Sequence, residues 1–165
     1  MKIIGFSNID STVQMVLKCD SSMLVNRKPF FIPDWSNDVR MTPCAVLRVS
    51  RMGKNIGQKF ASRYYDAVAP GLNICAADIL VKGDDVKAWA FDYSLPLGNF
   101  MDLSQWQEET IMSFDEAIHR VSEIMTIRQG DLIFVDCNVA SRPLVKEEVI
   151  VVNNDEQELL YCKIK

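Results

Sequence analysis

Short apolar or alternating runs dominate the hydrophobic pattern of this chain. They have the length and the β-branched content that are typical of β-strands. The pattern predicts strands at 2–6, 45–49, 72–76, 132–135, 149–152 and 159–164. The last two runs flank Asn153, Asn154 and Asp155, polar residues that tolerate left-handed backbone angles. We therefore expect the chain to close in a β-hairpin.

Helical periodicity is clearest after Ser113. The sequence at 113–116, Ser-Phe-Asp-Glu, has the form of a capping box, in which the Ser113 hydroxyl accepts from the backbone N–H of Glu116 and the Glu116 side chain reaches back. Apolar residues then recur at helical spacing, and Gly130 is expected to stop the helix.

A second helix is predicted over 57–68. Phe60 and Tyr64 stand four residues apart there and are expected to be buried, whereas Lys59 and Arg63 are expected to face water. Many strands with two or three helices indicate an α+β fold that is mostly β.

Length and composition fit one ordinary domain. A chain of 165 residues and 18.8 kDa can bury a single core, and its 48% hydrophobic and 24% charged residues are usual globular values. We find no internal repeat and no Gly/Ser/Pro-rich linker. The prediction is a single domain over residues 1–165.

Charge and hydropathy exclude two classes of partner. The formal net charge of -4 comes from 18 basic and 22 acidic residues without a basic stripe, which argues against nucleic acid. No stretch approaches the roughly 20 apolar residues of a membrane span, and the opening apolar run is too short for a signal peptide. We expect a cytoplasmic protein with no membrane partner.

The cysteines and the histidine limit the chemistry. Five widely spaced cysteines contain no C-x-x-C pair, so we expect reduced and mostly buried thiols. His119 is the single histidine, which excludes a site with two imidazoles. A Cys/His catalytic pair would have to use this residue.

Several segments, in order over nearly the whole chain, resemble one known family. They are KPFFIPDWSNDV at 28–39, VLRVSRMGKNIGQKFASRYYDAV at 46–68, GLNICAAD at 71–78, AFDYSLPLG at 90–98, IRQGDLIFVD at 127–136 and ELLYCKIK at 158–165. Together they resemble the fumarylacetoacetate hydrolase family, particularly its short bacterial isomerase and hydratase-like branch. The resemblance implies a mixed-sheet β-roll with a barrel-like body, assembled as a dimer. It also implies shortening in the N-terminal lid and around 100–113.

The same resemblance implies a metal site whose ligands are replaced. Enzymes of the family act on dicarbonyl and enol acids with Mg²⁺ or Mn²⁺ held by carboxylates, and such hard cations need charged oxygen ligands. The family's Glu-x-Glu pair corresponds here to Thr42-Pro43-Cys44, and its ligand aspartate corresponds to Asn73. A hydroxyl, a thiol and a neutral amide therefore stand where the family has three carboxylates, so we expect no metal cofactor.

Other positions of the family's pocket are also altered. The arginine after the ligand aspartate corresponds to Ala77, and the substrate-neutralising lysine corresponds to Trp89. The turn that binds the substrate carboxylate corresponds to Val135, Asp136, Cys137 and Asn138, and Asp136 would repel that carboxylate. The lid segment SNIDSTVQM contains no histidine.

Alternative interpretations of single residues stay open. Cys44 could be a nucleophile or a soft-metal ligand, or an inert buried thiol. Trp89 could stack on a flat ligand or fill the vacated cavity. Asp34 and Asp38 could form a metal pair or belong to a structural turn, and Asp84 and Asp85 are interpreted as a solvated turn.

These features predict a catalytically inactive relative of the family. Its role would be to bind a small organic acid, or to form a homodimer or a regulatory complex with an active relative. The alternative is an enzyme that uses metal-independent chemistry on a dicarbonyl or enol acid, as a hydrolase, isomerase or decarboxylase. A protein with a filled pocket and a purely structural role is a third hypothesis.

Overall fold

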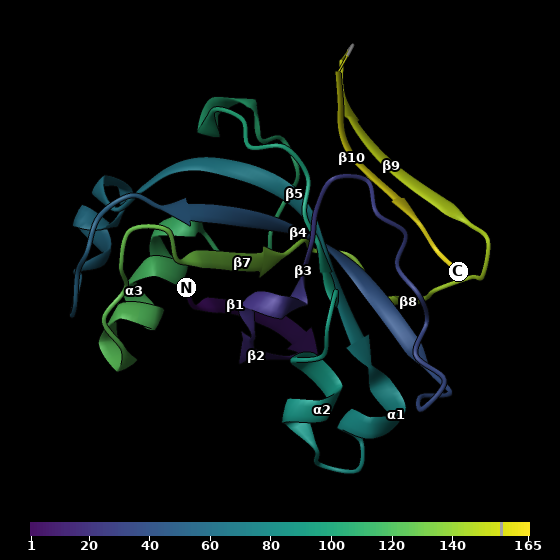
Figure 1. The fold of residues 1–165 in the computed structure, drawn as a ribbon. Coiled ribbons are helices and arrows are strands. Elements are labelled where there is room, and N and C mark those ends of the chain that lie inside the picture. The colour runs from purple at the N-terminus through teal and green to yellow at the C-terminus, as the bar shows by residue number, and fades with distance from the viewer. Residues whose placement is uncertain (156) are drawn as a thin grey trace.

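A computed structural model describes residues 1–155 and 157–165 of the chain. Its centre is a curved mixed sheet with the strand order β2-β1-β7-β4-β5, to which β8 adds beside β4 (Figure 1). The strands are β1 (Ile3–Ile9), β2 (Thr12–Lys18), β4 (Val39–Val49), β5 (Tyr65–Ala76), β7 (Leu132–Asp136) and β8 (Arg142–Pro143). β1 runs parallel to β7, and the other pairs are antiparallel. The predicted mostly-β, α+β class with a mixed sheet is confirmed.

Smaller elements surround this sheet. The helices are α1 (Ala77–Leu80), α2 (Asp85–Trp89) and α3 (Phe114–Ile124), and the 3-10 segments are η1 (Asp20–Ser22), η2 (Gln58–Arg63) and η3 (Leu103–Gln105). β3 (Met23–Leu24) pairs with β6 (Leu95–Pro96), and β9 (Val149–Asn154) pairs with β10 (Gln157–Lys163). Within the described residues, no helix is long and apolar enough to cross a membrane.

The two faces of the sheet have different covers because strand side chains alternate. On one face Ile4, Leu47 and Val135 pack against Ile118 and Val121 of α3. Farther along β4, the β9-β10 hairpin (Figure 1) packs with residues of β4 and β5 in a separate apolar cluster. The opposite face carries a third cluster that includes residues of α1 and α2. The candidate site lies on this opposite face.

The strand predictions are largely confirmed. Each predicted run overlaps one observed strand, namely β1, β4, β5, β7, β9 and β10. The closing hairpin is also present, although residue 156 of its turn lies outside the described residues. The missed strands are β2 and the two-residue strands β3, β6 and β8. β2 follows β1 through a two-residue turn with Asp10 at φ 48° and Ser11 at φ 65°. Both angles are left-handed, as a type I′ hairpin requires.

The helix predictions are confirmed in part. Ser113 caps α3 and its hydroxyl accepts from the N–H of Glu116 at 3.2 Å. The helix ends at Ile124 rather than at Gly130, which instead adopts a φ of 88° in the turn before β7.

The helix predicted over 57–68 is wrong. Pairing of Tyr65 with Val49 commits the chain to β5, which leaves six residues for the 3-10 segment η2. Residues 65–68 of the predicted helix thus belong to the strand instead. Phe60 is consequently 42% exposed, and the charged groups of Lys59 and Arg63 lie 4.9 and 5.2 Å from the centroid of its ring.

Candidate functional site

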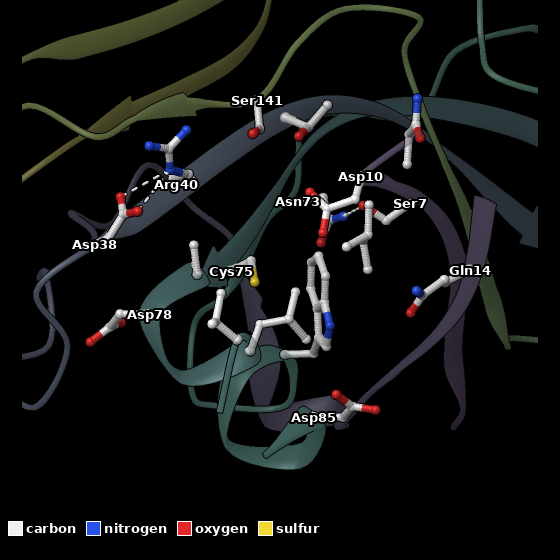
Figure 2. A pocket seen from close by; sticks show the side chains of 17 residues that line it. Ser7, Asp10, Gln14, Asp38, Arg40, Asn73, Cys75, Asp78, Asp85 and Ser141 are labelled. Carbon is white, nitrogen blue, oxygen red and sulfur yellow. Dashed lines mark hydrogen bonds and ion pairs between the residues drawn. The ribbon is translucent and has the colours of Figure 1, made fainter. Parts of the chain in front are cut away.

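A cavity of about 670 Å³ opens on the face of the sheet opposite α3. Its walls come from the β1-β2 hairpin, from β4 and β5, and from α1 and α2 (Figure 2). Thr42, Asn73, Ala77 and Trp89 are among the residues that line it, so four of the altered family positions meet in one place. The cavity remains open although Trp89, 7% exposed, packs in the apolar cluster beneath it.

Strand register explains why the floor of the cavity is polar. Thr42 pairs with Asn73 across β4 and β5, and Cys44 pairs with Asp136 across β4 and β7. Ser7 on β1 completes the group, because its hydroxyl donates to Asp136 Oδ2 at 2.5 Å. Asn73 Nδ2 donates to Asp136 Oδ1 at 3.0 Å. A carboxyl group, an amide and a hydroxyl thus form one buried network.

Asp136 has an unusual protonation equilibrium. Burial raises the pKa of its carboxyl group to about 7, against the opposing effects of the hydrogen bonds from Ser7 and Asn73 and of the Lys18 charge. The carboxyl group is 1% exposed. It therefore changes charge in the physiological range, behind the side chains of Ser7 and Asn73.

Asn73 has one unsatisfied polar atom. Its Nδ2 is directed to Asp136, which leaves Oδ1 buried and without a hydrogen-bond partner among the described residues. Such an unpaired buried acceptor costs about 1–3 kcal/mol. Asn73 also lines the cavity, although Oδ1 itself is enclosed.

The thiols near the site are in their protonated form. Burial, and next the charge of Asp136, raises the pKa of Cys44 well above its usual value. Burial raises the pKa of Cys137 to about 12. Both residues line a second cavity of about 260 Å³ rather than the larger one. His119 lies on α3, on the other side of the sheet, with Nδ1 2.8 Å from the carbonyl of Ile56, so the fold does not form a Cys44–His119 pair.

Lys18 is buried beside Ile74 and Trp89, and it connects β5 to α2. Its ammonium group is 2% exposed and donates to the carbonyls of Ile74 and Trp89 at 2.9 and 2.8 Å and to Ser94 Oγ at 3.1 Å. It also lies 5.4 Å from the centroid of the Trp89 ring. Burial lowers the pKa of Lys18 to about 7. All three donors are used within the protein, which gives Lys18 a structural role.

Two of the altered positions point away from the cavity. Val135 lies on the opposite face of the sheet, in the core beneath α3. Asn138 is exposed, and its N–H donates to the carbonyl of Glu109 at 2.9 Å. The β7 end therefore contributes Asp136 to the network beneath the larger cavity's floor and Cys137 to the smaller cavity.

In each of the two aspartate pairs, one member lines the cavity and the other does not. Asp38 lines the cavity and forms an ion pair with Arg40 at 3.0 Å, whereas Asp34 does not line it. Asp84 caps α2 by accepting from the N–H of Lys87 at 3.1 Å, and Asp85 lines the cavity. The turn that contains Asp34 is held by Asp78, which accepts from the Ser36 hydroxyl at 2.6 Å.

Sequence reasoning missed several residues of the site. Arg40 stands two positions before Thr42, so period two could have placed it on the same face. Ser7 lies just beyond the predicted end of the first strand. No local pattern marks Lys18 as buried. Asp10 reaches the cavity only because β2 folds back on β1.

The side chains at the altered ligand positions do not fit Mg²⁺ or Mn²⁺. Thr42 and Asn73 are neutral, Cys44 is a protonated thiol, and the nearby carboxyl group of Asp136 is engaged with Ser7 and Asn73. Among the residues that the structure describes, no three or more His, Cys, Asp or Glu side chains are placed to hold a metal ion. A hard dication needs several charged oxygens, which this group does not supply.

Solved structures share this fold at low sequence identity. A fumarylpyruvate hydrolase from Pseudomonas aeruginosa, in complex with Mn²⁺ and pyruvate, matches with a TM-score of 0.83 and 16% identity, over 99% of this chain and 88% of the other. The 5-carboxymethyl-2-hydroxymuconate delta-isomerase from Mycobacterium smegmatis matches with a TM-score of 0.84 and 14% identity, over 99% and 78%. A Yersinia pestis CO92 protein described as belonging to the fumarylacetoacetate hydrolase family matches with a TM-score of 0.83 and 16% identity, over 99% and 92%.

Comparisons of sequence alone gave no match. No protein-family model matches the chain, and no curated protein matches it. The shared architecture nevertheless extends over almost the whole chain in each of the three solved structures. This protein therefore has the fold of the fumarylacetoacetate hydrolase family.

Proposed function

We propose that this protein is a catalytically inactive relative of the fumarylacetoacetate hydrolase enzymes that acts as a binding or assembly module. The observation that carries this proposal is the chemistry of the polar side chains at the cavity floor and directly beneath it. Thr42, Cys44 and Asn73 occupy the positions that correspond to the family's metal ligands, and they are neutral. Asp136 contributes a carboxyl group, but Ser7 and Asn73 already use both of its oxygens.

The chemistry of the reaction supports the same conclusion. An enol acid develops negative charge on its oxygens, and a metal or a fixed cation must stabilise that charge. The structurally similar enzyme from Pseudomonas aeruginosa binds Mn²⁺ and pyruvate. In the present cavity the one lining guanidinium, that of Arg40, is paired with Asp38. Within the described residues, the lining thus offers an enolate neither a set of charged metal ligands nor an unpaired guanidinium.

Elemental analysis tests the first half of this proposal. We expect the purified protein to contain far less than one Mg²⁺ or Mn²⁺ ion per chain, even after incubation with either metal. Turnover of oxaloacetate and of an acylpyruvate, measured with added Mn²⁺, tests the second half. A fumarylpyruvate hydrolase that binds Mn²⁺, treated identically, is the positive control. One equivalent of bound metal together with turnover would refute the proposal.

A second candidate function is metal-independent catalysis on a keto or enol acid. The observation in its favour is the pair formed by Ser7, which lines the cavity, and Asp136, whose pKa of about 7 suits a general base. Turnover in the presence of EDTA that disappears in Asp136→Asn and in Ser7→Ala would establish this candidate. Absence of turnover in the folded wild-type protein would exclude it for the substrates assayed.

A further inference from the structure

The strand β2 forms an open edge of the central sheet. The strand order places β1 on one side of β2 and, within the described residues, no strand on the other side (Figure 1). The pairing of β2 with β1 continues without a bulge over all seven residues, Thr12–Lys18. The backbone N–H and C=O groups on the outer side of β2 are therefore available to another strand. Proteins usually protect such an edge with proline, a bulge or charged side chains.

This edge strand carries no exposed charge. Its single charged residue is Lys18, which is 2% exposed and whose ammonium group already donates to three acceptors within the chain. The strand also contains no proline. Asp10 and Asp20, which flank it, lie in the preceding turn and in η1, outside the strand. Like charges directly opposite each other oppose the pairing of two identical strands, so their absence permits β2 to pair with a second copy of itself.

An apolar stripe runs along the same strand. Val13, Met15 and Leu17 are spaced two residues apart, so they lie on one face of β2. Leu17 is 60% exposed and Val13 is 37% exposed, whereas Met15 packs partly against the cluster beneath α3. A strand paired with this edge would cover the exposed parts of the stripe. Removal of that apolar surface from water favours association.

The order of these residues is self-complementary. In antiparallel pairing about a two-fold axis at Met15, Val13 lies opposite Leu17 of the partner subunit, and Met15 lies opposite its own copy. The Cβ atoms of such opposite residues are about 4.5–5.5 Å apart, so these apolar side chains would be in contact. Moving the axis by one residue would leave Leu17 opposite Ser11, or Val13 opposite Cys19, both outside the stripe. The axis at Met15 therefore matches the stripe best.

We propose that two copies of this chain form a homodimer in which β2 pairs antiparallel with the partner's β2 about a two-fold axis at Met15. The two central sheets then become one continuous sheet, and the assembly closes at two chains because neither β2 edge stays open. The resemblance to the family implies a dimer but gives no interface. Half of β2 belongs to the shortened lid segment at 7–15, so this contact is expected to be particular to this chain. The inference goes beyond the proposed function and does not depend on whether the cavity is catalytic.

Substitution of exposed residues on β2 tests this interface. Leu17→Lys puts a charge into the apolar contact from each subunit, and sedimentation equilibrium should show dimerisation weakened by about tenfold or more. The double variant Val13→Glu with Leu17→Lys places opposite charges across the axis, so it should recover most of the affinity. Val149→Lys, at a 48% exposed valine on β9, is the matched control and should leave the dissociation constant unchanged.

A cysteine at the axis gives a second test, which does not depend on affinity. Met15→Cys in a Cys19→Ser background places two thiols directly opposite each other, with Cα atoms about 4.5–5.5 Å apart, as a disulfide requires. We expect oxidation with diamide to give a covalent dimer. Val149→Cys in the same background is the control and should remain largely uncrosslinked. Circular dichroism of each variant confirms that it is folded.

Three results would overturn the proposed interface. They are a monomeric wild-type protein throughout the micromolar range, a dimer that folded Leu17→Lys leaves intact, and a dimer that Val149→Lys dissociates while Leu17→Lys does not. A double variant that stays monomeric, together with no crosslink through Met15→Cys, would overturn the pairing about Met15. The proposed function is tested separately by metal content and turnover, so its failure would be distinguishable from failure of this interface.

Discussion

At the scale of single residues, Asp136 makes the stability of the protein depend on pH below neutrality. The folded protein holds its proton up to a pH of about 7, whereas an unfolded aspartate releases it near pH 3.9. Between these values the folded state binds more protons than the unfolded state. The contribution of Asp136 to the free energy of unfolding therefore decreases as the pH rises through this window, by at most about 4 kcal/mol.

We predict that Asp136→Asn removes this pH dependence. The amide of the new residue can be accommodated by a flip of Asn73, whose Oδ1 is unpaired. Relative to the variant, the free energy of unfolding of the wild type should decrease from pH 4.5 to pH 7.5. Urea denaturation at several pH values measures it, with Asp155→Asn as the control that should follow the wild type. A difference that stays constant with pH would contradict the assigned protonation.

At the scale of elements, the contact between β1 and β7 depends on Gly5. A Cβ atom at this position would lie 2.3 Å from ring atoms of Phe134, which covers the glycine on the neighbouring strand. We predict that Gly5→Ala lowers the free energy of unfolding by about 1–3 kcal/mol, because the ring must move out of a packed core. Gly57→Ala is the control, since its Cβ would have no neighbour nearer than 3.7 Å. Chemical denaturation of both variants measures the difference, and equal stabilities would contradict the packing.

Thr42 and Cys44 on β4 and Asn73 on β5 lie on paired strands, so new carboxylates at these positions would lie near one another. We predict that Thr42→Glu, Cys44→Glu and Asn73→Asp together restore Mg²⁺ binding, because ligand charge supplies most of the affinity for a hard cation. Catalysis should not return, because Trp89 stands in place of the family's lysine and the lid segment has no histidine.

Calorimetry with Mg²⁺, followed by oxaloacetate and acylpyruvate assays, checks both halves of this prediction. Circular dichroism of the triple variant confirms that it is folded. A folded variant that does not bind Mg²⁺ would mean that these positions are not equivalent to the metal ligands. Substantial turnover would mean that the changes at Trp89 and in the lid matter less than proposed.

At the scale of the whole molecule, we predict a two-fold symmetric homodimer. The expectation rests on the resemblance to the family, which implies a dimer. In a closed two-fold assembly both subunits contribute the same surface to the interface. Light scattering should give a mass of about twice 18.8 kDa. A mass of one chain across the micromolar range would contradict the prediction.

The sequence by itself determined the features that depend on neighbouring residues. Alternating and β-branched runs identified six strands, and the side chain of Ser113 identified the start of α3, because backbone geometry and capping are local. The resemblance also pointed to the neutral side chains of Thr42 and Asn73. Local patterns failed at 57–68, where pairing of β5 with β4 overrode a helical pattern.

Only the tertiary structure decided how the site is completed. The hydrogen bond between Ser7 and Asp136 joins residues 129 positions apart. The buried ammonium group of Lys18 donates to the carbonyls of Ile74 and Trp89, which are also distant in the sequence. The β1-β2 hairpin, α1 and α2 bring four carboxylates to one cavity from distant parts of the chain. Charge and burial at such a site depend on which strands become neighbours, and no local period encodes that choice.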